Sequence, residues 1–492
     1  MRVSSSYEHS LQAIYNQIGS RGIRVDTSRL EEGIKIVEAE ILRNLAICTN
    51  QWGCTVYLGA ENEPDEDETT TNRAVNINSS SGKRSFLAKL KELGYEVPKI
   101  TKKNEEGDYE QQYSAGELAI QKMLSTNQFN YPGGDPALKA VLRIRELGKL
   151  RSSYFNARLL SREGDSYFLS QYNVAGTLSG RRSSKKHSFG FGANAQNIPE
   201  HSSVAHLYRR CLVAREGNIF LFTDQVSAED WPVCALSYNL SALSELRSGV
   251  DRHSKLASMI FSIPLESRTE KEWKKSTERY LGKRTRHASN YDMTAPRMSD
   301  ALAQEGFSYS IPQCKVLLER VAQIDPSIKG VFHKYIQETL SSTRVLVTPE
   351  PFFRERQFLG ARPNDYNSTV FKEAYSYIPQ STVGDNTGYT VMELESSYPS
   401  TERAIVQEGH DSIVQDIPKD PDTILKYLNR TTAAFRRKIR FSNGIELEIP
   451  IEAKLGYDFN NSIKLQSFTG QAIKEVLEQL EDEKSKNSQL VF

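Results

Sequence analysis

A short polar segment, residues 408–412, separates two apolar runs and carries a carboxylate at its tip. The runs cover residues 404–406 and 413–414, and Gly409 lies between them. This pattern predicts a β-hairpin with Gly409 in the turn. A carboxylate such as Asp411 on a tight hairpin is held by rigid backbone and faces open space, as a metal-binding or catalytic acid requires. Ordinary solvated turns also favour aspartate, so this segment alone leaves both interpretations open.

A second carboxylate, Asp224, directly follows a run of apolar residues. The run, residues 219–223, has the length and composition of a buried β-strand. A carboxylate placed after such a strand lies at the edge of a sheet, where functional sites gather. Two further acids, Glu229 and Asp230, follow shortly after it in the chain.

A basic and aromatic segment, residues 283–291, places three functional side chains on one side of a predicted helix. Lys283, His287 and Tyr291 are four residues apart and therefore share one helix face. Two cationic or titratable groups and an aromatic ring on one face could clamp a triphosphate and its base. A basic amphipathic helix packed on acidic neighbours explains the pattern equally well.

Small, hydroxyl-bearing and basic residues gather in two adjoining loops. Residues 176–187 combine glycines, serines and lysines with Arg181 and Arg182, and residues 190–199 carry amide side chains such as Asn197. Loops of this kind let backbone amides and guanidinium groups approach phosphates closely. The sequence weighs a nucleic-acid or phosphate site and an ordinary flexible loop equally.

The overall composition is that of a globular protein and indicates no particular partner. The chain has 492 residues, 38% hydrophobic and 25% charged, with a net charge of +1, so only local clustering can indicate nucleic acid. The five cysteines are scattered without a CxxC pair, which argues against a disulfide framework or a zinc site and favours a reducing cytoplasm. The N-terminus lacks a signal-peptide core, and no apolar run is long enough to span a membrane.

Helical periodicity dominates much of the chain. Asp26 or Thr27 can cap a long helix whose apolar residues recur at helical spacing to residue 45. The acidic residues 60–68 predict a surface loop or a docking insertion. The other predicted elements are helices at 87–93, 115–125, 136–160 and 474–486, a largely helical region from 249 to 340, a strand at 167–172, and a hairpin at 441–448 with Asn-Gly in its turn.

Taken in order, these segments resemble the polymerase domain of family A DNA polymerases, the bacterial DNA polymerase I type and its bacteriophage relatives. The resemblance covers nearly the whole chain. Residues 449–457 are similar to bacteriophage members of the family. The segments that carry the resemblance are residues 21–26, 177–181, 194–199, 224–229, 283–291 and 410–411.

This resemblance implies an α+β fold, a right-hand polymerase with an antiparallel-sheet palm, helical fingers and a helical thumb. Residues 1–160 would form the thumb and N-terminal helices, with an acidic loop at 60–82. Residues 161–237 and 346–492 would form the two parts of the palm, and residues 238–345 the fingers.

The resemblance also implies template-directed addition of dNTPs to a primer 3′-hydroxyl by two-metal-ion phosphoryl transfer. Asp224 and Asp411, with the main chain of Gln225, would hold two Mg²⁺ ions. The implied nucleotide contacts are Lys283, His287 and His253 at the phosphates, Tyr291 on the base and sugar, and Glu229 against a 2′-hydroxyl. The implied primer–template contacts are Arg181, Asn197, Gln380 and His410.

The chain departs from the family pattern in its fingers helix and beside its second aspartate. Lys283 stands where the family usually has arginine, and His287 where it has the lysine taken as general acid for pyrophosphate. Histidine can perform this proton transfer near neutral pH, so we expect His287 to keep the role, with the nearby Arg284 and Arg286 as sources of fixed charge. Ser412 replaces the usual third acid, which implies that this acid is dispensable. Pro296 predicts an early end or bend of the helix.

The implied partners are primer–template DNA and dNTPs. Because the recognisable segments begin at the thumb, we expect no intrinsic 3′–5′ exonuclease, so that editing would come from a separate protein. The acidic loop could dock a processivity factor. We expect a cytoplasmic location, in a bacterium or a phage-infected host, and no membrane partner. Two alternatives stay open: a catalytically inactive DNA-binding replication protein, and a polymerase that uses an RNA template or rNTPs.

Overall fold

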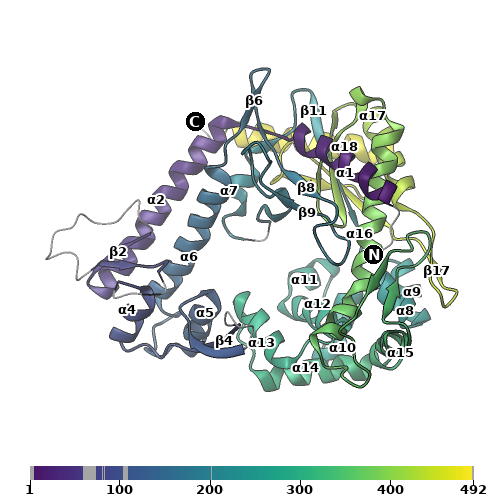
Figure 1. Ribbon diagram of the computed structural model, residues 1–492. Helices are drawn as coiled ribbons and strands as arrows, with labels where there is room; N and C mark the ends of the chain where they lie inside the picture. Colours follow the sequence, from purple (N-terminus) through teal and green to yellow (C-terminus); the bar gives the residue numbers. More distant parts are fainter. Residues whose placement is uncertain are drawn as a thin grey trace. The chain divides into compact units, whose positions relative to one another are not determined.

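The computed structural model describes residues 5–58, 74–79, 81, 84–103, 109–200 and 202–489 (Figure 1). The chain divides into two compact units, each built from separated stretches of sequence. The larger unit comprises Met1–Arg29, Ala157–Met293 and Val316–Phe492, and the smaller unit comprises Leu30–Asn156 and Thr294–Lys315.

A five-stranded antiparallel sheet lies at the centre of the larger unit. Its strand order is β14-β15-β11-β18-β19. In the central strand β11, Ile219, Phe220 and Leu221 are fully buried, which explains the continuous apolar run. The predicted strand and hairpin are therefore confirmed. The strands are β11 (Asn218–Gln225), β14 (Ile405–Glu408), β15 (Ser412–Pro418), β18 (Ile451–Gly456) and β19 (Ser462–Lys464).

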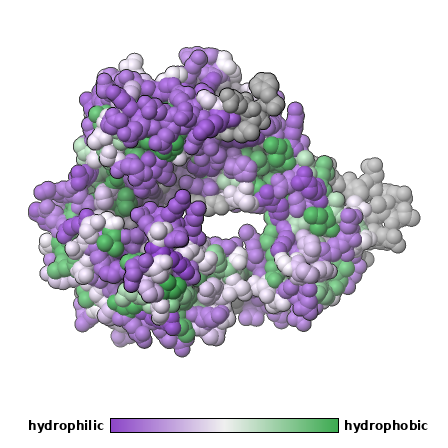
Figure 2. All heavy atoms as spheres, turned by 180° about the vertical axis from the view of Figure 1, so that it is seen from behind, coloured by the Kyte–Doolittle hydropathy of each residue, from purple (hydrophilic) through white to green (hydrophobic). Residues whose placement is uncertain are grey.

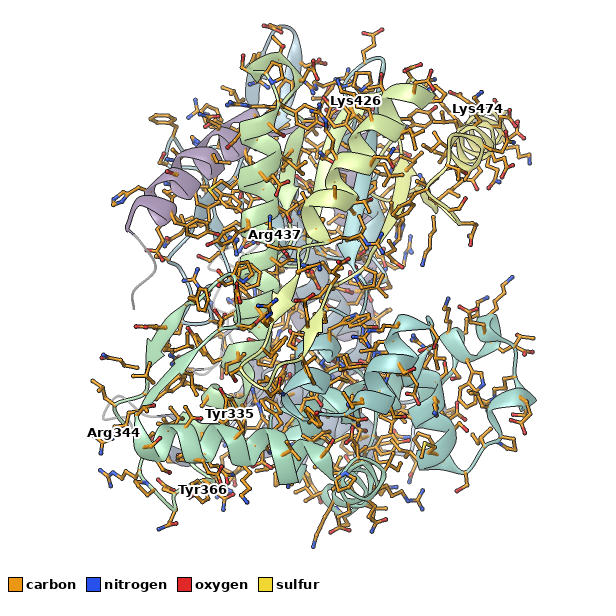
Figure 3. The ribbon with its side chains drawn as sticks, turned by 90° about the vertical axis from the view of Figure 1, so that its right-hand side faces the viewer. Tyr335, Arg344, Tyr366, Lys426, Arg437 and Lys474 are labelled. Atoms are coloured by element: carbon orange, nitrogen blue, oxygen red, sulfur yellow. The ribbon has the colours of Figure 1, made fainter. Side chains whose placement is uncertain are left out.

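Four helices complete the core around this sheet: α1 (Ser5–Arg21), α16 (Thr369–Ser397), α17 (Pro421–Phe435) and α18 (Gly470–Gln489). Helix α17 packs against α16, α18 and β15. Figure 3 shows α17 and α18 side by side, with Lys426 and Lys474 exposed on them. The shared core includes Tyr15, Ile219, Val391, Leu428 and Ile473, so the sheet and these helices form one packed body.

A smaller sheet in the same unit has the order β10-β1-β7-β6. The continuous strand predicted at 167–172 is wrong, because β7 ends at Phe168 and β8 begins at Gln171. The backbone N–H of Ser170 donates instead to the carbonyl of Gly19, 3.3 Å away, which takes the chain out of the ladder. The strands are β1 (Ile23–Val25), β6 (Leu160–Arg162), β7 (Asp165–Phe168) and β10 (Leu212–Val213), and a separate hairpin pairs β8 (Gln171–Asn173) with β9 (Ser183–Lys185).

The region from 249 to 340 is largely helical, as predicted. Helix α12 begins after Ser276, whose hydroxyl caps the first turn, and it ends at Asn290. Pro296 does not end or bend this helix, since it lies in the first turn of α13, where proline is favoured. The helices of the larger unit here are α8 (Asp230–Leu236), α9 (Leu240–Arg247), α10 (Arg252–Phe261), α11 (Glu270–Lys275), α12 (Thr277–Asn290), α14 (Ile311–Ile324, from Val316 onward) and α15 (Lys334–Ser342).

Short strand pairs lie near the end of the larger unit. Strand β16 (Ile439–Arg440) pairs with β17 (Glu446–Leu447), which confirms the predicted second hairpin. Gly444 in its turn has a φ of +84°, the left-handed conformation that the Asn-Gly sequence favours. Strands β12 (Val345–Val347) and β13 (Glu355–Gln357) form another antiparallel pair.

The smaller unit is mainly helical. Helix α5 packs on α13, where Lys122 and Asp300 form an ion pair of 2.7 Å. The helix predicted at 136–160 ends earlier, since α6 passes into a π-helix that stops at Phe155. The acidic residues 60–68 lie outside the described residues. The elements are α2 (Thr27–Trp52, from Leu30 onward), α4 (Phe86–Glu92), α5 (Glu117–Thr126), α6 (Pro136–Leu150), α13 (Ala295–Gln304), β2 (Thr55–Tyr57), β3 (Ala74–Asn76), β4 (Lys99–Lys103) and β5 (Tyr109–Tyr113).

The surface is predominantly hydrophilic on the face shown in Figure 2. Among the residues that the structure describes, no helix has both the length and the apolar character needed to cross a membrane. All five cysteines are buried and none forms a disulfide.

Candidate active site

The register of the central sheet brings the two predicted aspartates together. Asp224, on β11, pairs across the ladder with Ser412 on β15, the residue directly after Asp411. The backbone N–H of Gln225 donates to the carbonyl oxygen of Asp411 over 3.1 Å. On its other side, Asp224 pairs with Glu452 of β18. Asp224 and Asp411 are far apart in sequence, but they therefore lie at one end of adjacent strands. Glu452 lies opposite Asp224 on the other side of β11.

The turn that carries Asp411 is closed by its own backbone. The N–H of Gly409 donates to the carbonyl of Ser412 over 2.8 Å. Gly409 lies in this turn as predicted, and the next residue, His410, adopts the left-handed conformation with a φ of +70°. A Cβ at Gly409 would lie 2.5 Å from the Ser412 hydroxyl oxygen, so a larger residue there would require the Ser412 side chain to rotate.

A pocket of about 260 Å³ opens beside the two aspartates. Asp224 and Asp411 line it together with residues from both neighbouring strands and from the 195–200 loop. The polar lining consists of Gln196, Glu200, Arg209, Thr223, Asp224, Gln407, Asp411, Ser412, Glu452, Lys454 and Ser462.

The electrostatics of this pocket disfavour two bare carboxylates. Burial, together with the charges of Asp411 and Glu452, raises the pKa of Asp224 to about 8, although Lys454 opposes the shift. Burial also raises the pKa of Asp411, while a backbone hydrogen bond and Arg181 oppose the shift. A divalent cation would supply the missing positive charge, and carboxylate oxygens are the ligands that Mg²⁺ prefers.

The two carboxylates fit a metal ion that takes its remaining ligands from water and substrate. Among the described residues, no group of three or more histidine, cysteine or acidic side chains is arranged to hold a metal ion. Mg²⁺ usually binds through one or two carboxylates and completes its shell with water and substrate phosphates. Asp224 and Asp411 therefore fit Mg²⁺ as a partial site.

Gln225 links this site to the long helix behind it. Its side-chain amide donates to the Thr387 hydroxyl over 3.0 Å and accepts from Asn386 over 2.8 Å. Asn386 in turn accepts from Arg437 over 3.2 Å, a residue labelled in Figure 3. The buried side chain of Gln225 thus fixes the strand end, and its main chain stays at the site.

Glu229 connects two other predicted site residues. One carboxylate oxygen accepts from the Tyr291 hydroxyl and the other from the Arg181 guanidinium. Burial and the Glu229 charge both raise the pKa of Tyr291, so its phenol stays protonated. Residues from the 176–187 loop, the start of α8 and the end of α12 therefore meet in one cluster.

Lys283 and His287, which share the predicted face of helix α12, lie in different surroundings. Lys283 is exposed, whereas His287 is half-buried beside His253 of α10, with their ring centroids 6.2 Å apart. Burial lowers the pKa of His287, and it lowers that of His253 to about 4, although Asp230 opposes both shifts. Both imidazoles are therefore neutral near pH 7 in the ligand-free protein.

Arg286 lies away from the exposed helix face. Its guanidinium is buried and donates to Asp325 over 2.7 Å, with Asp230 at 3.9 Å. These internal carboxylates neutralise its charge, so the expectation that Arg286 provides charge to a phosphate is wrong.

The predicted DNA contacts lie around the same site with different degrees of exposure. His410 is half-buried, and burial lowers its pKa to about 4. Asn197 is exposed, while its neighbour Gln196 reaches His410, with 3.5 Å between Nε2 and Nδ1. Gln380 is half-buried on α16, one residue before Ser381, whose hydroxyl donates to the loop carbonyl of residue 179 over 2.6 Å.

Several pocket residues were not predicted from the sequence. The alternation of polar and apolar residues in 451–455 could have placed Glu452 and Lys454 on one face of a strand. No local pattern distinguishes Gln196 from Asn197, because both lie in one short 3-10 helix, Ala195–Asn197.

Comparisons with known proteins identify the family of the chain. The family model described as DNA polymerase family A matches residues 60–461. The thermostable DNA polymerase I of Thermus filiformis is 25% identical over 330 residues, which cover 66% of this chain and 36% of that protein. The DNA polymerase of Bacillus phage SP01 is 22% identical over 299 residues, which cover 58% of this chain and 30% of that protein.

A solved structure has a similar fold. It is the polymerase domain of Pol1 from M. smegmatis in complex with DNA primer-template and dNTP, with a TM-score of 0.69 and 18% identity. The match covers 92% of this chain and 70% of that chain. The chain spans about a third of the length of curated relatives that it matches, such as the thermostable DNA polymerase I of Thermus aquaticus, of which 36% is covered.

Proposed function

This chain belongs to DNA polymerase family A, and from this premise we propose that it is a template-directed DNA polymerase. It adds dNTPs to the 3′-hydroxyl of a DNA primer and releases pyrophosphate. The observation that carries the proposal is the pairing of β11 with β15, which sets Asp224 beside Asp411 in a polar pocket.

The proposed architecture is a right hand. Residues 161–237 and 346–492 form the palm, residues 238–345 the fingers, and residues 1–160 the thumb with the N-terminal helices. The central antiparallel sheet supports the palm assignment, and the helices from α9 to α15 support the fingers.

Asp224 and Asp411, with the main-chain carbonyl of Gln225, are the proposed ligands of two Mg²⁺ ions. Bound there, the ions would neutralise charge on the attacking and leaving oxygens. The two side chains must give up their protons to bind metal, which their raised pKa values oppose. The paired strands hold both carboxylates at fixed separation, so little reorganisation is required on binding.

Lys283, His287 and His253 are the proposed contacts of the incoming triphosphate. Burial keeps both imidazoles neutral in the free protein. The negative charge of a bound triphosphate favours the protonated form, so His287 would gain a proton on nucleotide binding. That proton is then available at the imidazole for transfer to the leaving pyrophosphate.

Glu229 and Tyr291 are the proposed contacts of the nucleotide sugar and base. The hydrogen bond between them orients the Tyr291 ring, and Arg181 holds the other Glu229 oxygen. A carboxylate whose two oxygens are both hydrogen-bonded in this way has a fixed position, and it would sterically exclude a 2′-hydroxyl. Arg181, Asn197, Gln380 and His410 are the proposed contacts of the primer–template, and Gln196 joins them through its position beside His410.

Primer extension tests the proposal. The wild-type protein is given a DNA primer–template, Mg²⁺ and either dNTPs or rNTPs. We expect extension with dNTPs, strong discrimination against rNTPs, and loss of extension in Asp411→Asn. Asp422→Asn, which changes an exposed acid on α17, is the matched control and should extend normally.

Each outcome discriminates between hypotheses. A wild-type protein that binds primer–template without extending it would refute the polymerase proposal and favour a DNA-binding replication protein. Equal extension with rNTPs would contradict the role of Glu229. Full activity in Asp411→Asn would overturn the site assignment.

A further inference from the structure

A group of buried charges surrounds Arg286 of helix α12. Arg286, Asp230 and Asp325 are 3%, 4% and 6% exposed. They come from three separate elements, since Asp230 begins α8 and Asp325 directly follows α14. Charged side chains are seldom buried this deeply unless they are paired, so their contacts decide what they do.

Arg286 bridges the two carboxylates. Its Nη1 donates to Asp325 Oδ2 over 2.7 Å, and its Nε lies 3.9 Å from Asp230 Oδ1. Arg252 of α10 is the second cation here, with 3.6 Å between its Nη1 and Asp230 Oδ2. Although burial raises the pKa of both aspartates, the charge of Arg286 is the largest opposing cause and helps to hold each below its ordinary value. The distances and the pKa shifts therefore agree that these groups are charged and paired.

Close packing does not fill this side of α12. A cavity of about 250 Å³ lies beside the charged groups and is lined by Asp230, Arg252, Arg286 and Asp325 together with residues of α9 and α10. Asp230 Oδ1 and the Nε and Nη2 of Arg286 have no hydrogen-bond partner within the described part of the chain. Because the cavity gives the Arg286 side chain room to move, its ion pairs with the two aspartates keep it in place.

Both ends of the contact between Arg286 and Asp230 adjoin proposed nucleotide contacts. Asp230 directly follows Glu229, and Arg286 directly precedes His287. Tyr291, directly after α12, donates its hydroxyl hydrogen to Glu229. The α12 segment is thus joined to the start of α8 at two points, which restricts its rotation about its own axis. Adjacent helix residues project about 100° apart, so that rotation decides where the neighbouring side chains point.

We propose that Arg286 is a positioning residue for the incoming nucleotide. Its ion pairs with the two buried aspartates set the rotation of α12, and that rotation places His287 and Tyr291 at the nucleotide. Arg286 acts through these residues and does not contact the nucleotide itself. The inference rests on the proposed function, because the nucleotide site that it refines belongs to that function.

Arg286→Met is the main test variant, because methionine keeps an unbranched side chain and removes the charge. Three quantities are measured: the affinity for the next correct dNTP on a dideoxy-terminated primer, which cannot be extended; the affinity for primer–template; and the preference for dNTP over rNTP in single-turnover extension. We expect the dNTP affinity and the preference each to fall about tenfold, with the affinity for primer–template changed less than about threefold. Unchanged dNTP affinity and unchanged preference would overturn the inference.

A double variant separates positioning from stability. Arg286→Met leaves Asp325 buried without its cation, whereas the double variant with Asp325→Asn lacks both charges. We expect the double variant to melt at a higher temperature than Arg286→Met but to keep the weakened dNTP affinity, since neither side chain can then form the ion pair. Recovery of both the melting temperature and the dNTP affinity would show that Arg286 acts through stability alone, and the inference would fail. A double variant that melts no higher than Arg286→Met would refute the ion pair itself.

Arg286→Lys keeps the inference testable if methionine prevents folding. Lysine retains a charge near Asp325 but lacks the planar fork that can reach two carboxylates at once. This variant should melt close to the wild type and still bind the dNTP more weakly. Wild-type dNTP affinity in Arg286→Lys would show that bridging of the two aspartates is not needed, against the inference.

The matched control is another ion pair of the same helix. Glu278, in the first turn of α12, accepts from Arg268 over 3.0 and 3.2 Å, and both side chains are 30% exposed. Glu278→Gln should change the dNTP affinity less than about twofold. An equal loss in this control would show that any charge removed from α12 has the same effect, and it would overturn the specific role of Arg286. A wild-type protein that binds the dNTP without extending a normal primer would refute the proposed function and leave this binding test intact.

Discussion

The raised pKa of Asp224 predicts proton release when Mg²⁺ binds the protein without DNA. This carboxyl group has a pKa of about 8 in the metal-free protein, so it holds a proton at neutral pH. A metal ligand must be deprotonated. For one group with this pKa, binding of Mg²⁺ at Asp224 releases about 0.9 proton near pH 7 and about 0.1 proton near pH 9.

The same shift sets the pH dependence of stability. The folded-state pKa of Asp224 lies above its ordinary value of 3.8, so its contribution favours folding below that value and is lost as the pH rises through about 8. Bound Mg²⁺ compensates for the resulting charge. We therefore expect Mg²⁺ to raise the melting temperature more near pH 8 than near pH 5.

Isothermal titration calorimetry in buffers of different ionisation enthalpy measures the released protons. The wild type should show the drop in release between pH 7 and pH 9, and Asp224→Asn should release almost none at either pH. Asp422→Asn, an exposed acid on α17, should behave as the wild type. Equal proton release by the wild type at the two pH values would refute the reasoning.

Three further changes test the surroundings of the site. Asp325→Ala removes the carboxylate that bonds the buried guanidinium of Arg286 over 2.7 Å, so denaturation should show a loss of about 3 kcal/mol, and an unchanged stability would contradict this ion pair. Gly192→Ala places a Cβ 1.7 Å from a backbone oxygen and should yield little folded protein. Gly190→Ala is also at positive φ but has no neighbour within 4 Å, so it should lower the free energy of unfolding by only about 1–2 kcal/mol. Similar yields of the two variants would argue against the close approach at Gly192. Glu452→Gln removes a like charge across the ladder from Asp224, so calorimetry near pH 8 should detect less proton release on Mg²⁺ binding, and greater release would contradict the sign of the interaction.

Local sequence patterns were enough to identify Asp224 and Asp411 as candidate site residues, but they did not show that the two residues are neighbours in the fold. Each lies where an apolar run ends, and such runs are visible in the sequence. Their meeting depends on the register between β11 and β15, which is set by contacts between distant residues. Only the family resemblance carried that information before the structure was known.

Buried charges were the least predictable part of the site. Arg286 lies among exposed basic residues in sequence, yet its side chain is internal and bonded to Asp325. Arg181 and Arg182 are adjacent in an irregular loop, and Arg181 bonds Glu229 while Arg182 is buried against Gly384 and Gly388 of α16. Periodicity assigns sides in helices and strands, but it gives no direction to side chains in such a loop.

The fit between Arg182 and Gly388 also constrains which substitutions each of the two positions accepts. An arginine at position 182 occupies the space in which any side chain at position 388 would begin. A larger residue at position 388 would require the Arg182 side chain to move, so the residues at these two positions constrain each other. We therefore expect the effect of a substitution at one position to depend on the residue at the other.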